Sequence, residues 1–148
     1  MQESISTLLS DIDCTPLFVP GKIDALSNEE FRSQFRSLLD TDIARKNQNI
    51  AYMWVTETPI PRLKGSSCVI YIGKTVYSLR ERHRQWAKIE SEGFNWLRHN
   101  HIIETFGAIQ FIILLCKNGI SPKNLETNLL DKYLKLHLEN PPMNSTSR

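Results

Sequence analysis

The stretch Cys-Val-Ile-Tyr-Ile-Gly-Lys-Thr at residues 68–75 ends in Gly73-Lys74-Thr75, the residues that close a phosphate-binding P-loop. Such a loop would bind the phosphates of a nucleotide. Its motif also requires a glycine five positions before Gly73, and Cys68 stands there instead. The residues between are β-branched or aromatic and favour an extended strand over a loop whose N–H groups turn inward. The sequence therefore predicts a strand here and no nucleotide cofactor.

Two charged residues fall on the apolar sides of predicted helices. At about 100° per residue, Arg82 lies beside Trp86 on a helix predicted over about residues 77–90. On the last predicted helix, Glu126 lies within the apolar arc that starts at Leu125. Burying a charge is costly without a partner, so an inward arginine suits an anion and an inward carboxylate suits a metal ion or another cation. A structural ion pair between Arg82 and Glu126 is the competing interpretation.

These residues belong to an ordered set along the chain. The set consists of Ile50-Ala51-Tyr52, Tyr71-Ile72-Gly73, Leu79-x-x-Arg82, Glu126 and Pro141-Pro142-Met143-Asn144. Over about residues 50–144 it resembles the motifs of the GIY-YIG nuclease superfamily. That family cleaves DNA phosphodiester bonds with a divalent metal ion, and its fold is a small three-stranded antiparallel sheet with flanking helices. The resemblance therefore implies a metal-dependent DNA endonuclease.

The resemblance also implies a role for each residue. Glu126 would bind Mg²⁺ (or Mn²⁺), an ion that keeps several waters and needs few protein ligands, and the metal would stabilise the leaving oxygen. Arg82 would hold the scissile phosphate and its developing charge. Tyr52 and Tyr71 would flank the attacking water, one of them acting as or supporting the general base. A tyrosine base needs its pKa of about 10 lowered, and Lys74, Arg82 and the metal are placed to do so.

The chain departs from the family pattern in three places. Ala51 replaces the glycine of the first motif, and the loop between the two tyrosines is longer than in compact members. Trp86 stands one helical turn after the arginine, where the family has His or Tyr, and an indole neither takes up a proton nor accepts a hydrogen bond. The side chains that could replace it are His83, on the same helix, and Tyr77, His99 or His101. A catalytically weak or inactive module that binds DNA or a protein is therefore the alternative function.

Positive charge is concentrated in the segment that contains these motifs. Residues 1–61 carry 5 Lys/Arg and 9 Asp/Glu (−4), residues 62–98 carry 8 and 3 (+5), and residues 99–148 carry 5 and 4 (+1). Local positive charge suits a phosphate-rich partner such as DNA, although a solvated helix face would have the same composition. The residues predicted to contact nucleic acid are Lys74, Arg80, Arg84, Lys88 and Asn144, the last as a polar group near the metal end.

The elements that must position these residues follow the order α-β-β-α-β-α. The predicted helices are a short one near the N-terminus, one from a capping box at Ser27 and Glu30 to about Arg45, one over about 77–90, and one that is capped by Ser121 and runs from Pro122 to before Pro141. The predicted strands are 50–55, 68–73 and the almost continuously apolar 108–116. Residues 16–21 are predicted to form a loop and 93–101 an irregular segment.

We therefore predict an α/β (α+β) fold with a small three-stranded antiparallel sheet flanked by helices. Residues 1–48 are predicted to form an N-terminal helical extension, and residues 49–148 a GIY-YIG-like nuclease domain. The extension carries no recognisable motif, so an extra helical layer, a dimer interface and a DNA-contacting arm stay open for it. Assembly into a homo-oligomer stays open as well.

The composition is that of an ordinary globular domain, with 148 residues, 41% hydrophobic and 23% charged. The three cysteines, Cys14, Cys68 and Cys116, are odd in number and widely spaced, which supports neither a disulfide framework nor a zinc site. The N-terminus lacks a basic segment followed by an apolar run, and the longest apolar stretch is too short to cross a bilayer. These features predict a cytoplasmic protein with no membrane partner.

Overall fold

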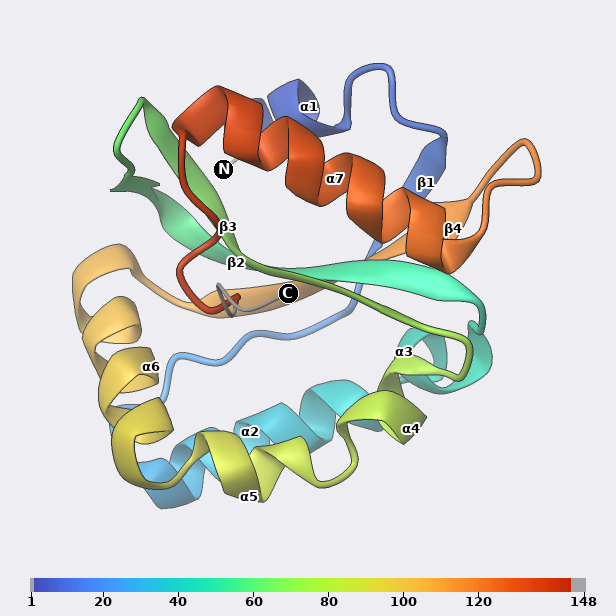
Figure 1. Cartoon of the computed structure of the whole chain (residues 1–148). Helices are drawn as coiled ribbons and strands as arrows, with labels where there is room; N and C mark the ends of the chain where they lie inside the picture. The colour runs from blue at the N-terminus through green and yellow to red at the C-terminus, as the bar shows by residue number, and fades with distance from the viewer. Residues whose placement is uncertain (1, 145–148) are drawn as a thin grey trace.

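The computed structural model describes residues 2–144 and contains a four-stranded antiparallel sheet with helices on both faces (Figure 1). Its strands are β1 (Cys14–Phe18), β2 (Ile50–Pro61), β3 (Ser66–Thr75) and β4 (Ile109–Cys116), in the spatial order β1-β4-β2-β3. The chain is therefore of the α+β class, as predicted. The prediction of three strands is wrong, because the sheet has four.

The additional strand is β1, whose position overlaps the loop predicted from Pro16 onward. β1 forms one edge of the sheet and pairs with β4. Lys117 N donates to Asp13 O, so residues 13 and 117 form a hydrogen-bonded pair. Hydrogen-bonded and non-hydrogen-bonded pairs alternate along an antiparallel ladder, and Pro16 is three positions further along β1. Pro16 therefore falls at a non-bonded position, where its missing N–H costs no hydrogen bond. The first 48 residues thus contribute a strand of the sheet in addition to helices.

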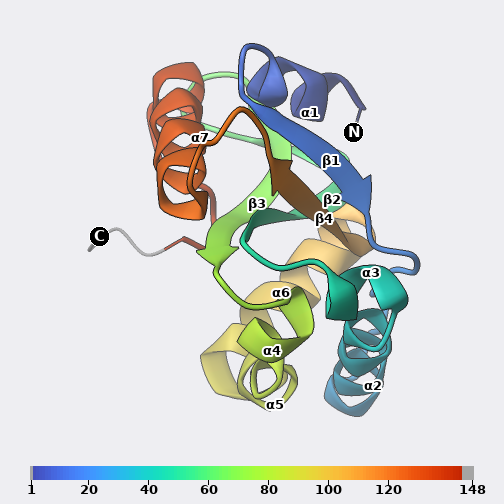
Figure 2. The ribbon, with the colours of Figure 1, turned by 90° about the vertical axis from the view of Figure 1, so that its right-hand side faces the viewer.

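The helices are α1 (Gln2–Leu9), α2 (Asn28–Leu39), α3 (Asp42–Lys46), α4 (Leu79–His83), α5 (Trp86–Glu90), α6 (Gly93–Phe106) and α7 (Pro122–His137). α1 and α7 cover one face of the sheet, and α2 to α6 cover the other (Figures 1 and 2). Strand side chains alternate between the two cores, with Tyr52 and Trp54 on the α2–α6 side and Ala51 and Met53 on the α7 side.

Both predicted caps are present. Ser27 begins α2 and its hydroxyl accepts from Glu30 N at 3.3 Å, and Ser121 begins α7 in the same way. The predicted helix to about Arg45 is in fact two helices, because Thr41 caps a new one by accepting from Ala44 N at 3.4 Å. A hydroxyl that satisfies a backbone N–H in this way favours a new helix start over continuation of the old one.

Two predictions between β3 and β4 are wrong. The helix predicted over 77–90 is split into α4 and α5, which meet at residues 84–85. The segment 93–101, predicted to be irregular, belongs to α6, which starts at Gly93 with φ 55° and places its core residues at helical spacing. Those core-facing residues are His99, Ile102, Ile103 and Phe106. No helix within residues 2–144 is long and apolar enough to cross a membrane.

Candidate functional site

Tyr52 lies across the neighbouring strand at Gly73. The two residues face each other in the β2–β3 ladder. A Cβ atom added at Gly73 would lie 2.5 Å from both Cζ and Oη of Tyr52. Because β3 is the other edge strand of the sheet, the phenol that crosses it brings its hydroxyl to the outer edge. Gly73, in the motif that the sequence singled out, is thus required by the path of the Tyr52 ring.

Tyr71 lies beside Tyr52 on the same face of the sheet. It faces Trp54 in the ladder, two pairs along from Tyr52 and Gly73, and its ring centroid is 6.0 Å from that of Tyr52, with 30° between the ring planes. Tyr52 is fully buried, whereas Tyr71 is 7% exposed. The structure therefore brings the two tyrosines together, and Tyr71 has the greater access to solvent.

Arg82 and Glu126 approach this pair from opposite faces of the sheet, since α4 lies on one side and α7 on the other (Figures 1 and 2). Burial is the main cause that raises the pKa of Tyr52 above its ordinary value of 10, and Tyr71 raises it further. The Arg82 charge acts to lower this pKa, and the Glu126 charge acts to raise it. Tyr71, Arg82 and Glu126 therefore all lie within electrostatic range of the Tyr52 phenol.

A tyrosine that acts as a general base needs a lowered pKa, and the pKa of Tyr52 is raised instead. Its Oη is buried and makes no hydrogen bond of good geometry within residues 2–144, although Tyr71 lies close enough to favour the protonated form. At neutral pH, Tyr52 is therefore a hydroxyl donor. A role as general base does not fit its surroundings.

Arg82 does not point into the core, contrary to the helical-wheel prediction. Its side chain is exposed, and its guanidinium carbon lies 4.8 Å from the centroid of the Trp86 ring. A guanidinium over an indole face is attracted by the negative potential of the ring. Trp86, the departure from the family pattern, thus holds the arginine at the surface. A buried Arg82–Glu126 core pair is not what the structure contains.

His83 takes the inward position instead. It is fully buried, and its Nδ1 lies 3.1 Å from Leu79 O, which can only accept, so Nδ1 carries the proton. Its Nε2 is buried and has no hydrogen-bond partner among the described side chains and backbone. Burial lowers the pKa of His83 to about 3. The ring lies 4.8 Å from that of Tyr52, edge to face, so a neutral imidazole packs against the tyrosine.

The other side chains considered as replacements for Trp86 lie elsewhere. Tyr77 is 61% exposed in the turn before α4. His99 is buried and its Nε2 lies 3.1 Å from Glu90 Oε2. His101 is exposed and lines a separate hollow next to Arg98. Among the four candidates, His83 is the one that contacts Tyr52.

Glu126 lies in the first turns of α7 and is half-buried. Leu125 and Leu129, both fully buried, anchor this side of the helix on the sheet. Within residues 2–144 there is no group of three or more His, Cys, Asp or Glu side chains that could hold a metal ion. A half-buried carboxylate within electrostatic range of Tyr52 fits a Mg²⁺ ion that keeps most of its waters and takes its other ligands from a phosphate.

Asn144 has a different position from the one predicted. Its side chain is 7% exposed, Nδ2 donates to Ile72 O at 2.9 Å, and Oδ1 accepts from Ile72 N at 3.0 Å. Met143 N donates to Ile70 O at 2.8 Å. Both polar ends of the amide are thus engaged with the outer edge of β3. Asn144 supports the strand that carries Tyr71 and Gly73, and its amide is not displayed to DNA.

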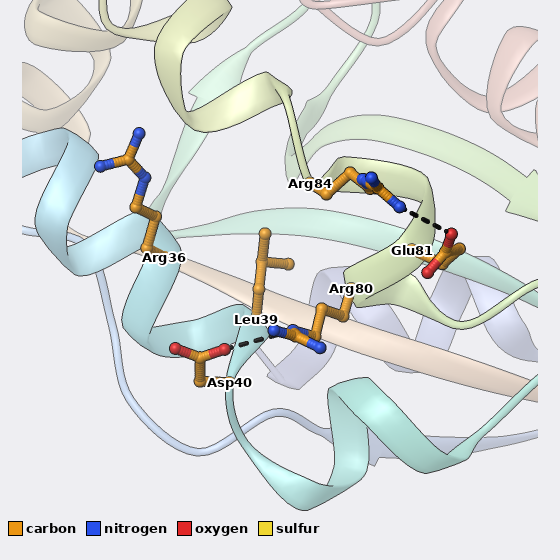
Figure 3. A pocket seen from close by; sticks show the side chains of 6 residues that line it. All are labelled: Arg36, Leu39, Asp40, Arg80, Glu81 and Arg84. Carbon is orange, nitrogen blue, oxygen red and sulfur yellow. Dashed lines mark hydrogen bonds and ion pairs between the residues drawn. The ribbon is translucent and has the colours of Figure 1, made fainter.

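A hollow of about 410 Å³ separates α2 from α4 (Figure 3). Its lining residues are Arg36, Leu39, Asp40, Arg80, Glu81 and Arg84. Arg80 Nε lies 3.2 Å from Asp40 Oδ1, and Arg84 Nη1 lies 3.1 Å from Glu81 Oε1. Arg36 lines the α2 side of the same hollow, with its guanidinium turned away from Arg80, and no ion pair joins it to a described residue (Figure 3).

Arg36 was missed in the sequence because it belongs to a helix with no motif, and only the packing of α2 beside α4 brings it near Arg80. The other predicted contacts, Lys74 on β3 and Lys88 on α5, are exposed.

Models of known protein families, curated proteins and solved structures were compared with the chain, and none of them matched. The site consists of two tyrosines, an arginine and a glutamate, beside an arginine-rich surface.

Proposed function

We propose that the chain is a metal-dependent DNA endonuclease of the GIY-YIG type that hydrolyses phosphodiester bonds. The observation that carries this proposal is the grouping of Tyr71, Arg82 and Glu126 around the Tyr52 phenol, with Arg82 and Glu126 on helices that cover opposite faces of the sheet. These side chains supply what hydrolysis of a phosphodiester needs, which is a phosphate clamp, a metal-binding carboxylate and hydroxyls to orient water.

Arg82 binds the scissile phosphate in this proposal. Its guanidinium is exposed and held over Trp86, so the donors are directed at the solvent side of the site. A guanidinium forms charge-assisted hydrogen bonds to phosphate oxygens, and these strengthen as negative charge develops during attack. The arginine thus both positions the phosphate and stabilises the transition state.

The two tyrosines have separate roles. Tyr52 keeps its proton, since burial and the neighbouring Tyr71 and Glu126 raise its pKa, and it orients the attacking water or a phosphate oxygen as a donor. Tyr71 is the more exposed of the two residues and takes part in removing the proton of the water. Glu126 holds Mg²⁺ or Mn²⁺, which when bound supplies Lewis-acid stabilisation of the leaving oxygen.

DNA binds along exposed basic residues of α2, α4 and α5, and at Lys74, which lies opposite Ala51 and therefore on the α7 side of the sheet. These are Lys74, Arg80, Arg84 and Lys88 from the sequence, together with Arg36 from the structure. Phosphate contacts of this kind position a duplex without reading its sequence. The proposal includes the predicted cytoplasmic location and leaves the choice of DNA structure to experiment.

A second candidate is a non-catalytic module that binds DNA or a protein through the same basic surface. Trp86 favours it, because an indole cannot transfer a proton and the nearest imidazole, His83, is buried and neutral. Binding to DNA that persists in Glu126→Gln, with no cleavage by the wild type under any divalent metal, would support this candidate over the endonuclease.

The endonuclease proposal is tested by cleavage of plasmid, nicked-circle and branched DNA with Mg²⁺ or Mn²⁺. Glu126→Gln removes the charge with little change in volume and should abolish metal-dependent cleavage while leaving the unfolding midpoint in place. Asp131→Asn is the matched control, because Asp131 is an exposed carboxylate on the same helix. If the wild type leaves every substrate intact, or if Glu126→Gln cleaves as well as Asp131→Asn, the proposal is wrong.

A further inference from the structure

Two of the three cysteines face each other in the sheet. Cys14 opens β1 and Cys116 ends β4, and the two residues are directly opposite in the antiparallel ladder. They are 102 positions apart in the chain, and both pack against the core on the α7 side. All three cysteines are free thiols in this structure, and Cys68 is buried away from the pair. The fold therefore brings together two thiols that the spacing of the cysteines along the sequence does not predict as a pair.

The position of this pair in the ladder suits a cross-strand disulfide. Lys117 N donates to Asp13 O, which makes residues 13 and 117 a hydrogen-bonded pair. The next pair, Cys14 and Cys116, is therefore a non-hydrogen-bonded one, in which facing Cα atoms are typically about 4.5 Å apart and the side chains lie closer. Disulfides form between residues whose Cα atoms are about 4.4–6.8 Å apart. The backbone spacing typical of such a pair therefore matches the spacing that a disulfide requires.

The surroundings allow a reagent to reach the pair. Both thiols are partly exposed at the β1 edge of the sheet. Burial raises the pKa of Cys14, and the neighbouring Cys116 raises it further, while burial alone raises the pKa of Cys116. The two thiols therefore lie within electrostatic range of each other, as their facing positions in the ladder require. The thiolate is the reactive form, so the pair should react faster as the pH rises.

We propose that Cys14 and Cys116 form a redox-sensitive modification site, which an oxidant of the disulfide class converts into a reversible cross-strand disulfide. The probe is oxidised glutathione. One cysteine thiolate attacks its S–S bond and releases one reduced glutathione, leaving a mixed disulfide on the protein. The facing thiolate then displaces the second glutathione. Two protons and two electrons leave the cysteine pair, and two molecules of reduced glutathione carry them.

The bond would lock the edge strand onto the sheet. It would close a loop that contains β2, β3 and α4, with Tyr52, Tyr71 and Arg82, and leave α7 outside. Cys116 Sγ also lies 3.4 Å from Asn49 O, and Asn49 N donates to Val76 O. Oxidation would thus also remove a thiol donor from the residue that leads into β2. This inference does not depend on the proposed nuclease activity.

The test uses the reduced full-length chain incubated with oxidised glutathione at mildly alkaline pH. Thiols counted after unfolding should fall from three to one, and non-reducing peptide mapping should recover the Cys14 and Cys116 peptides as one linked species. Treatment with a reducing agent should restore all three. Cys68→Ser is the matched control and should lose both of its remaining thiols, with the same link. The oxidised wild type should also unfold at a higher temperature than the reduced form.

Three outcomes would overturn the inference. The first is that all three thiols survive at glutathione ratios that oxidise a simple dithiol. The second is that the reaction stops at a mixed disulfide with glutathione on either cysteine. The third is that the link joins two chains, which a non-reducing gel detects as a dimer. The mapping is done on the wild type, so the result stands even if Cys14→Ser or Cys116→Ser folds poorly.

Discussion

The phenol of Tyr52 occupies the space that a side chain at position 73 would need. Residues 52 and 73 are ladder partners, and a Cβ at Gly73 would approach Tyr52 Cζ and Oη to 2.5 Å. That contact is far inside van der Waals distance. Tyr52 of the first motif therefore packs directly over Gly73 of the second. This packing places the Tyr52 hydroxyl over the edge strand β3.

We expect Gly73→Ala to destabilise the protein by about 1–3 kcal/mol, the usual cost of overpacking a core. The φ angle of Gly73 is not in the left-handed region, so the cost comes from the Tyr52 ring rather than from the backbone. Urea unfolding measures it, and a double-mutant cycle with Tyr52→Ala isolates the contact. If Gly73→Ala costs as much in the Tyr52→Ala background as in the wild type, the tyrosine is not the cause.

The bidentate contact between Asn144 and Ile72 predicts a second stability effect. Asn144→Ala leaves both backbone groups of Ile72 without their partner at a buried edge, which should cost about 1–3 kcal/mol. Hydrogen exchange of the Ile72 amide should accelerate in this variant. Asn128→Ala, at an exposed position of α7, is the control and should change the unfolding free energy by less than about 0.5 kcal/mol. Equal effects of the two substitutions would contradict the assigned role.

The buried imidazole of His83 predicts a loss of stability in acid. Its pKa is about 3 in the folded chain and about 6.5 when unfolded, so the unfolded state binds more protons between these values. The stability is therefore complete above about pH 6.5 and falls as the pH drops toward 3, by at most about 1.4 kcal/mol per pH unit from this group.

His83→Phe keeps an aromatic ring in the cluster and removes this titration. The difference in unfolding free energy between wild type and variant should therefore shift in favour of the variant as the pH is lowered from 7 to 4. Denaturant unfolding at several pH values measures it, and the exposed-site variant His101→Gln is carried as the control. Parallel curves for wild type and His83→Phe would show that His83 does not titrate as its burial requires.

The hollow between α2 and α4 predicts that Arg36 contributes to DNA affinity. Each phosphate contact adds about 0.9 to the slope of log Kd against log salt concentration, so Arg36→Ala should reduce that slope by about this amount. Lys135→Ala removes an exposed charge on α7 and should leave the slope nearly unchanged. Fluorescence anisotropy with a DNA duplex, without metal, separates this binding effect from cleavage. An unchanged slope in Arg36→Ala would remove α2 from the binding surface.

Local sequence patterns determined the α+β class, the strands around residues 50–55, 68–73 and 108–116, and the caps at Ser27 and Ser121. These features depend on residues a few positions apart, where alternation, helical spacing and hydroxyl capping act directly. The same patterns gave the wrong secondary structure where a segment depends on contacts with residues far away in the chain. β1 exists because β4 offers a ladder to a segment that contains a proline, and α6 is helical because its buried side meets the core.

For the candidate site, too, some features could be predicted from the sequence and others depend on the tertiary structure. The residue types and their order along the chain pointed to Tyr52, Tyr71, Arg82 and Glu126 without any structure. Only the tertiary structure decided which side chain of α4 points inward, because two short helices, rather than one long one, put His83 in the core and left Arg82 over Trp86. It also decided that Tyr52 keeps its proton, that the Asn144 amide hydrogen-bonds the backbone of β3, and that Cys14 lies opposite Cys116 in the sheet. Burial, strand register and the alternation of hydrogen-bonded and non-hydrogen-bonded pairs arise only when elements pack together. They cannot be read from the order of residues along the chain.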